Sequence, residues 1–296
     1  MALELSALKP WLLGLGIVVG YASYADAQHR FRQHAATQTA PLALVDATNS
    51  FGAQTVSITQ SGPWRVIQSN GVPDHAVGAF PNAGNPNRIA GQNHMFRVTL
   101  SPEVGAAQPL PRGASFGVAI NGVPFDPNAA EFWQGNPRSG WNYNALGGAV
   151  ALGLDANYAH VQPTGAYHYH GLPIGLMQSL DWSAAAPSPL LGYAADGFPI
   201  YALTAEVGGE TVRMTSSYQL KSGNRPAGDG PQGAHDGTFV EDFEYVAGSG
   251  TLDACNGAYV TSPETQAVTY AYILTDTYPV IPRCLVGEIG RGFAKR

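Results

Sequence analysis

The chain has 296 residues, of which only 12% are charged, and its formal net charge is -6. Lysine and arginine total 15 residues and form no cluster, which excludes the basic footprint of a nucleic-acid-binding protein. A hydrophobic share of 45% excludes a disordered chain, while 36 glycines and 22 prolines favour many short elements joined by turns.

The beginning of the chain is typical of a secretory signal peptide, which we predict at residues 1–27. An apolar run at 11–25 ends in a small-x-small cleavage site at 25–27. An uncleaved anchor is the weaker alternative, because glycines interrupt the run and it falls short of the roughly 20 residues that span a bilayer. We expect no other membrane span and a periplasmic or secreted protein, with a flexible lead-in at 28–45 and one β domain at 46–296.

Short alternations of apolar and polar residues recur along the mature chain and predict strands. The apolar run 198–207, the pair Gly208-Gly209 and the stretch 210–220 predict a hairpin, because two glycines supply the positive φ angles of a tight turn between antiparallel strands. Helical patterns are limited to 129–134 and 175–182. The predicted fold class is therefore mainly β, an antiparallel sandwich-like or barrel-like single domain with few short helices. The clearest strands are expected at 55–60, 94–100, 115–122 and 267–275.

Two further features concern the second half of the chain. Residues 221–237 form a long glycine-rich stretch, which predicts a loop that is either functional or mobile. The chain has two cysteines, Cys255 and Cys284, and in an exported protein such a pair favours a disulfide over a metal site or a nucleophile.

The stretch Tyr167-His168-Tyr169-His170 carries the clearest chemical signal. Side chains alternate along a strand, so we expect His168 and His170 on one face and Tyr167 and Tyr169 on the other. Two imidazoles so placed can converge on one ion, and imidazole suits zinc and copper, among other metals. The alternative is structural, with both histidines hydrogen-bonded to backbone in an aromatic core.

A metal site needs further ligands, and three other histidines are candidates. His160 is the nearest in sequence, while His75 directly follows an aspartate and His235 directly precedes one. A carboxylate can orient an imidazole, which makes Asp236 a supporting candidate. Asp196, in an Asp-Gly pair, is a candidate ligand or base, although Asp-Gly is also an ordinary turn.

Several established types of site do not fit. A multicopper oxidase needs four H-x-H pairs and a cysteine ligand, whereas this chain has one pair. A copper brace needs an N-terminal histidine, but the predicted mature chain begins at Gln28. No G-x-S-x-G, P-loop, G-x-G-x-x-G or H-E-x-x-H motif is present, and a serine-histidine-aspartate triad is left open. The acidic stretch 236–253 lacks EF-hand spacing, so solvated loop carboxylates are favoured over a calcium site.

The chain resembles the YHYH domain family of exported proteins. The resemblance is carried by the YHYH tetrapeptide at 167–170 and by motifs spread over most of the mature chain. It implies an exported domain whose namesake motif forms a site, with no reaction attached to it. The other motifs are NGVPDH (70–75), GVAINGVPFDP (117–127), LLGYAADGFPIY (190–201), LDACNG (252–257) and TDTYPVIPRCLVG (275–287).

Two hypotheses for the function follow. The first is an exported copper- or zinc-binding domain that uses the YHYH histidines, with enzymatic activity left open. The second is a non-catalytic cell-envelope or extracellular domain that binds a glycan, an envelope protein or a small molecule through a tyrosine-rich surface, with YHYH in a structural role.

Overall fold

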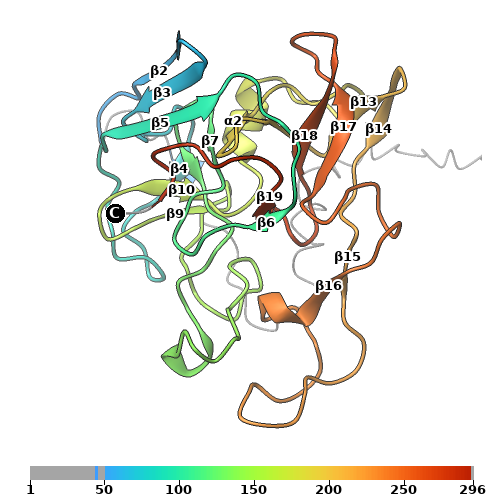
Figure 1. Ribbon diagram of the computed structural model, residues 1–296. Coiled ribbons are helices and arrows are strands. Elements are labelled where there is room, and N and C mark those ends of the chain that lie inside the picture. The colour runs from blue at the N-terminus through green and yellow to red at the C-terminus, as the bar shows by residue number, and fades with distance from the viewer. Residues whose placement is uncertain (1–43, 46–50, 295–296) are drawn as a thin grey trace, which may run out of the picture.

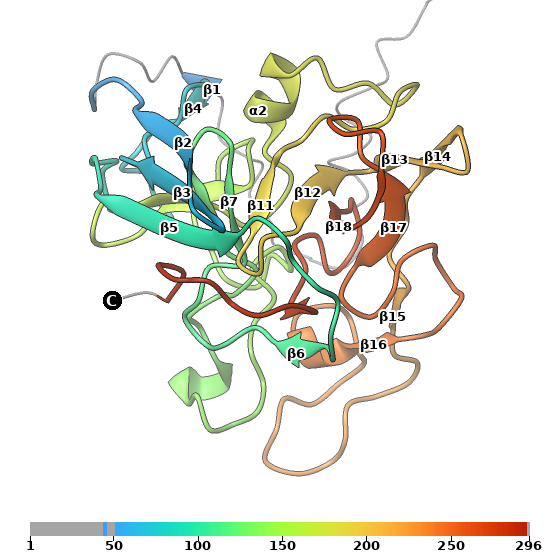
Figure 2. The same ribbon diagram turned by 45° about the horizontal axis from the view of Figure 1, so that its top comes forward.

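The computed structural model describes residues 44–45 and 51–294. The predicted signal peptide lies outside these residues, as does the lead-in except for Leu44–Val45, which forms the short strand β1. The chain folds into nineteen strands, one α-helix and two 3-10 helices within the described part (Figures 1 and 2). No helix there is long and apolar enough to cross a membrane.

The elements follow one another along the chain with these bounds. The strands are β1 (Leu44–Val45), β2 (Val56–Ser61), β3 (Trp64–Ser69), β4 (Val77–Gly78), β5 (His94–Thr99), β6 (Gln108–Pro109), β7 (Gly117–Ala119), β8 (Pro124–Phe125), β9 (Ala159–Val161), β10 (Tyr167–Tyr169), β11 (Gly192–Ala194), β12 (Pro199–Ala202), β13 (Thr204–Val207), β14 (Glu210–Arg213), β15 (Tyr218–Leu220), β16 (Phe243–Tyr245), β17 (Gly257–Thr261), β18 (Val268–Leu274) and β19 (Cys284–Leu285). The helices are η1 (Trp133–Gly135), α2 (Ile174–Ser179) and η2 (Val240–Asp242).

One large curled sheet organises the molecule and confirms the mainly β fold class. Its ten strands run in the order β14-β13-β17-β18-β12-β11-β7-β8-β10-β9, so β9 is an edge strand. Most neighbours are antiparallel, as expected, but β8 pairs parallel with β10 and β12 pairs parallel with β18. A three-stranded sheet of β2, β3 and β5 lies on the opposite side of the molecule from β13, β14 and β17 (Figures 1 and 2).

Both faces of the large sheet are covered, as the alternation in β18 illustrates. Tyr270, Tyr272 and Leu274 belong to the main hydrophobic cluster, whereas Ala271 and Ile273 belong to a second, smaller one. Successive side chains of a strand point to opposite faces, so a run of apolar residues such as this one is buried on both sides.

The hairpin at Gly208-Gly209 is present, with φ angles of 64° and 86°, and joins β13 to β14. Its first arm is shorter than the apolar run suggested, because Leu203 takes a positive φ of 64° and ends β12 before β13 begins. The two halves of the run therefore occupy separate places in the sheet.

The helical predictions had mixed outcomes. The helix expected at 175–182 is observed as α2, whereas the one expected at 129–134 is wrong. That segment reaches only the start of the 3-10 turn η1, because Phe132 is extended and forms a β-bridge with Asn142, and Gln134 has a left-handed φ of 54°. The disulfide between Cys255 and Cys284 is confirmed, with 5.2 Å between the two Cα atoms.

Candidate metal centre

The YHYH segment forms one arm of a short antiparallel hairpin, β9–β10. His168 pairs directly with His160 across the two strands, so their side chains lie on the same face. His170 returns to that face two residues after His168. Its backbone N–H donates to the Tyr158 carbonyl at 2.7 Å, which extends the pairing past the end of β10. Strand alternation and hairpin pairing together bring three imidazoles to one side.

The turn between the strands sets this pairing. Gln162 N–H donates to the Ala166 carbonyl, and Gly165 N–H donates back to the Gln162 carbonyl. Gly165 has a φ of 87°, a conformation that glycine adopts without steric cost. A Cβ at this position would lie 2.6 Å from the Cβ of Ala90. The glycine is therefore required both by the turn and by the packing above it.

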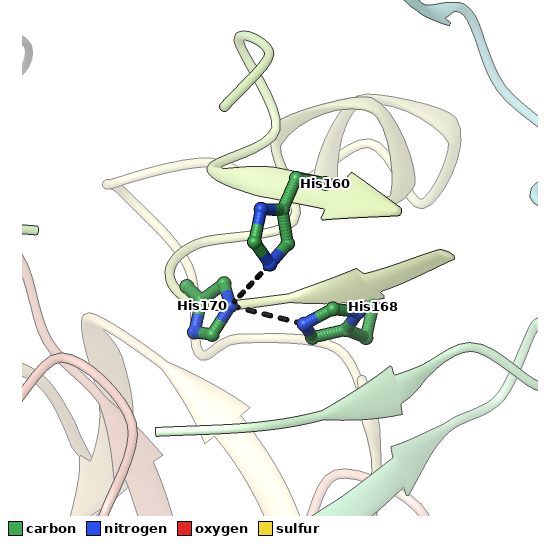
Figure 3. A group of neighbouring side chains, drawn as sticks. All are labelled: His160, His168 and His170. Carbon is green, nitrogen blue, oxygen red and sulfur yellow. Dashed lines mark hydrogen bonds between the residues drawn. The ribbon is translucent and has the colours of Figure 1, made fainter. Parts of the chain in front are cut away.

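The three imidazoles converge through their Nε2 atoms (Figure 3). His170 Nε2 lies 3.0 Å from His168 Nε2 and 3.1 Å from His160 Nε2. His168 and His170 are 3% and 4% exposed, while His160 is partly exposed. Two nitrogens bound tetrahedrally to one zinc ion, each at about 2.0 to 2.1 Å, would lie about 3.3 Å apart. The observed spacing is close to that of a metal-bound set.

Backbone carbonyls orient two of the rings from behind. His160 Nδ1 lies 2.7 Å from the Leu152 carbonyl, and His168 Nδ1 lies 3.2 Å from the Ala166 carbonyl. A carbonyl oxygen only accepts, so these contacts favour the tautomer with the proton on Nδ1 and the lone pair on Nε2, while the Asn85 amide nitrogen also lies 3.2 Å from His160 Nδ1. This is the arrangement in which histidines bind metals, because the outer hydrogen bond fixes the tautomer and the ring orientation. The Nε2 atoms of both rings lie next to the Nε2 of His170.

The opposite face of β10 anchors the hairpin in the core. The Tyr169 hydroxyl contacts His75 Nε2 at 2.6 Å and accepts from the Asn121 amide at 3.0 Å. The Tyr167 hydroxyl donates to Asp155 Oδ2 at 2.7 Å. Complete burial raises the pKa of both tyrosines well above the ordinary value, so both hydroxyls stay protonated and act as neutral hydrogen-bonding groups.

His75 is therefore not part of the histidine cluster, contrary to the expectation from sequence. Its Nε2 bonds Tyr169 and its Nδ1 lies 2.9 Å from the Ala76 carbonyl, so both ring nitrogens are used. The physical reason is strand alternation, since Tyr169 points to the face opposite His168 and His170. His75 supports the strand that carries the cluster.

His235 and Asp236 also lie outside the cluster. His235 Nδ1 contacts Asp242 Oδ1 at 3.0 Å, and Asp236 accepts from Arg225 at 2.5 Å and from the Thr238 N–H. Asp242 is fully buried and takes two hydrogen bonds from the Arg225 guanidinium. These residues brace the glycine-rich loop 221–237, and pairing with arginine explains the buried carboxylate without calcium.

Asp196 occupies a third location. Its Oδ2 accepts from the Tyr272 hydroxyl at 2.6 Å and from the Gly287 N–H at 2.9 Å. Burial raises the pKa of this carboxyl, and the hydrogen bonds oppose that effect. Asp196 links the turn before β12 to the segment after β19 and does not approach the histidines closely enough to share an ion with them.

A cleft of about 480 Å³ opens onto all three histidines. Asp126 is buried on its wall, immediately after β8. The Asp126 N–H donates to the Tyr169 carbonyl, which places this residue beside His170. Sequence reasoning assigned Asp126 no role, although it lies within the GVAINGVPFDP motif. Its position depends on the parallel pairing of β8 with β10, which no local pattern predicts.

The aromatic surface of the alternative hypothesis is sparse. Tyr167, Tyr169, Tyr201 and Tyr272 are among the largest fully buried side chains. Among the described large hydrophobic residues that are exposed, only Tyr245 and Tyr259 are aromatic. Within the described part of the chain, the tyrosines therefore serve mainly the core and its hydrogen bonds.

Comparison with known proteins supports the motif-based expectation. The family model described as YHYH protein matches residues 95–287, which include all three histidines of the cluster and Asp126. No curated protein and no solved structure is significantly similar to the chain. The match covers about two thirds of the sequence, and the chain belongs to the YHYH protein family.

Proposed function

We propose that this protein is an extracytoplasmic metal-binding domain in which His160, His168 and His170 coordinate one copper or zinc ion. The observation that carries the proposal is the convergence of three Nε2 atoms, with neighbouring pairs 3.0 and 3.1 Å apart. Imidazole nitrogen is a ligand that both copper and zinc accept, so three nitrogens brought to one point form a ligand set for a single ion.

The wider structure supports the same function. Backbone carbonyls contact the Nδ1 atoms of His160 and His168. The contact between Tyr169 and His75 anchors strand β10 in the core, so the geometry of the ligands would be preorganised. The Cys255–Cys284 disulfide supports a location outside the cytoplasm, where disulfides persist. Both copper and zinc bind imidazole nitrogen, so the three histidines are suitable ligands for either metal.

The test is metal content of the purified, disulfide-bonded protein after incubation with Cu²⁺ or Zn²⁺ and removal of excess ion. We expect about one ion per chain. His160→Gln and His168→Gln should each weaken binding by more than about 100-fold, because loss of an outer-shell partner alone costs 10- to 100-fold. His94→Gln is the matched control, since His94 is partly buried but outside the cluster.

Two outcomes would contradict the proposal. One is a folded wild-type protein that retains neither metal. The other is metal bound equally well by the wild type and both cluster variants, which would place the ion elsewhere. X-ray absorption on the zinc form should give nitrogen ligands at about 2.0 to 2.1 Å.

A further inference from the structure

His170 also borders a second cavity, which the proposed metal-binding function does not use. Its volume is about 320 Å³, and His170 is the only described residue that lines both this cavity and the cleft. A volume at the lower end of the range of small-molecule sites suits a small organic ligand. The cavity is therefore a candidate binding site of its own, directly beside the histidine cluster.

Aromatic and aliphatic side chains form much of the cavity wall. The rings of Phe243 and Tyr278 stack with their centroids 3.9 Å apart, and Tyr218 meets Tyr278 edge-on at 5.6 Å. The aliphatic part of the wall includes Leu146, Val280 and Ile281, which are all buried. A ligand with an apolar body would remove its surface from water by lying against these side chains.

Two hydrogen-bond donors line the same cavity, Arg283 and Tyr278. The Arg283 guanidinium donates to the Pro127 carbonyl at 2.6 Å and to Asn128 Oδ1 at 2.7 Å, and it has more N–H groups than these two contacts use. Among the described residues, the Tyr278 hydroxyl has no hydrogen-bond partner. Burial raises the pKa of Tyr278 to about 12, and the positive charge of the nearby Arg283 opposes that rise. The hydroxyl thus stays protonated and able to donate.

The charges around the cavity favour an anionic group on the ligand. Asp276 is the only carboxylate among its described lining residues, and it forms an ion pair with Arg213. Asp126 and Glu241 lie nearby and act in the opposite sense, but neither lines the cavity, whereas the guanidinium does. A cation on the histidine cluster would add positive charge beside His170, so metal loading would favour the same anion.

We propose that this cavity binds a small aromatic carboxylic acid, with its carboxylate accepting hydrogen bonds from Arg283 and Tyr278. Arginine suits this role because its planar guanidinium matches the geometry of a carboxylate. The ring of the ligand lies against the aromatic and aliphatic wall, beside His170. This binding site goes beyond the metal-binding function and does not depend on it.

Isothermal titration calorimetry of the metal-free, disulfide-bonded full chain with benzoate tests the proposal. Acetate carries the carboxylate without the ring, and benzyl alcohol carries the ring without the charge. We expect benzoate to bind at least about tenfold more tightly than either probe, because each of them lacks one of the two recognised parts.

Two variants test the anchor. Tyr278→Phe keeps the ring and removes the hydroxyl, and should weaken benzoate binding by about tenfold. Arg283→Gln removes the charge and should weaken it by more than about tenfold. The matched controls are Tyr259→Phe and Arg138→Gln, at exposed positions outside the cavity, which should leave benzoate binding unchanged. Thermal unfolding establishes that each variant is folded, and Tyr278→Phe decides alone if Arg283→Gln is not.

The outcomes are distinct. A wild-type protein that binds no benzoate would overturn the inference, as would acetate or benzyl alcohol bound as tightly as benzoate. Equal benzoate affinity in the wild type and the folded anchor variants would place the ligand elsewhere and overturn it as well. A protein that binds benzoate as expected but neither copper nor zinc would overturn the metal-binding function alone.

Discussion

His160 and His168 face each other directly across the β9–β10 hairpin, and His170 Nε2 lies within 3.1 Å of an imidazole from each strand. All three rings thus come from one short stretch of the chain, residues 160–170. Their relative positions depend on one pairing and one turn, so changes in the hairpin should act on metal binding even where they remove no ligand.

Gly165→Ala should lower both stability and metal affinity. The position combines a φ of 87° with an expected clash against Ala90, so the turn would distort and shift His160 relative to His168. Gly208→Ala is the matched control, because its φ is also positive but its Cβ would enter open space. The alanine at 165 should cost at least about 1 kcal/mol more than the alanine at 208, since both share the backbone strain of about 1 to 2 kcal/mol. Urea unfolding and zinc titration of both variants measure the difference, and equal effects would argue against the clash.

Tyr169→Phe should destabilise the fold by about 1 to 3 kcal/mol, because it leaves the buried partners His75 and Asn121 without their shared hydroxyl. Tyr259→Phe, at a position that is 61% exposed, should change stability by no more than about 0.5 kcal/mol. The measurement is the urea concentration at the midpoint of unfolding, compared between variants whose unfolding free energies depend equally on urea concentration. If the two variants unfold at the same midpoint, the buried network contributes no net stability.

Asp242→Asn should reduce stability at neutral pH and change its pH dependence. Burial raises the pKa of Asp242, but hydrogen bonds from Arg225, Phe239 and His235 outweigh it and hold the pKa below its usual value. A depressed folded pKa means that the carboxylate contributes stability above the unfolded pKa of about 3.9, and that this contribution is lost as pH falls through the folded value.

The difference in unfolding free energy between the wild type and Asp242→Asn should therefore be largest at about pH 6 and should decrease below about pH 4. Guanidinium unfolding across this range tests the expectation. A gap that does not vary with pH would show that the asparagine acts by disturbing packing and not by removing the charge.

Replacement of Cys255 and Cys284 by alanine should cost about 3 to 4 kcal/mol, the chain-entropy value for a loop closed over a separation of 29 residues. Neither cysteine belongs to the histidine cluster, so the folded variant should still bind one metal ion per chain. Thermal unfolding with and without reductant, together with metal analysis, checks both parts. Loss of metal from a variant that remains folded would connect the disulfide to the site.

Features that depend on local sequence patterns were predicted better than features that depend on long-range pairing. Alternation in a strand correctly placed His168 and His170 on one face and Tyr167 and Tyr169 on the other, because that period is a property of the backbone itself. The disulfide followed from composition and expected compartment. The sequence could not decide among His160, His75 and His235 as the third member of the cluster, since that choice depends on which strand lies beside β10.

The errors have a similar origin. No helix forms at 129–134 because Phe132 is extended and pairs with Asn142, and the apolar run 198–207 is divided because Leu203 adopts a left-handed φ. Positive φ at residues other than glycine leaves no mark in composition or periodicity. Asp126 was missed because only the parallel pairing of β8 with β10 brings it to His170.

The place of β9 at the end of the large sheet has a consequence for the behaviour of the edge. Side chains and a turn cover its outer side, because the Ala159 carbonyl accepts from the Asp155 N–H and the Val161 carbonyl accepts from the Asn85 and Asn87 amides. An ion bound to His160 would clamp this outermost strand to β10 from the side-chain face. Metal loading would then slow amide exchange in β9, so the ion would stabilise the end of the sheet as well as occupy the site.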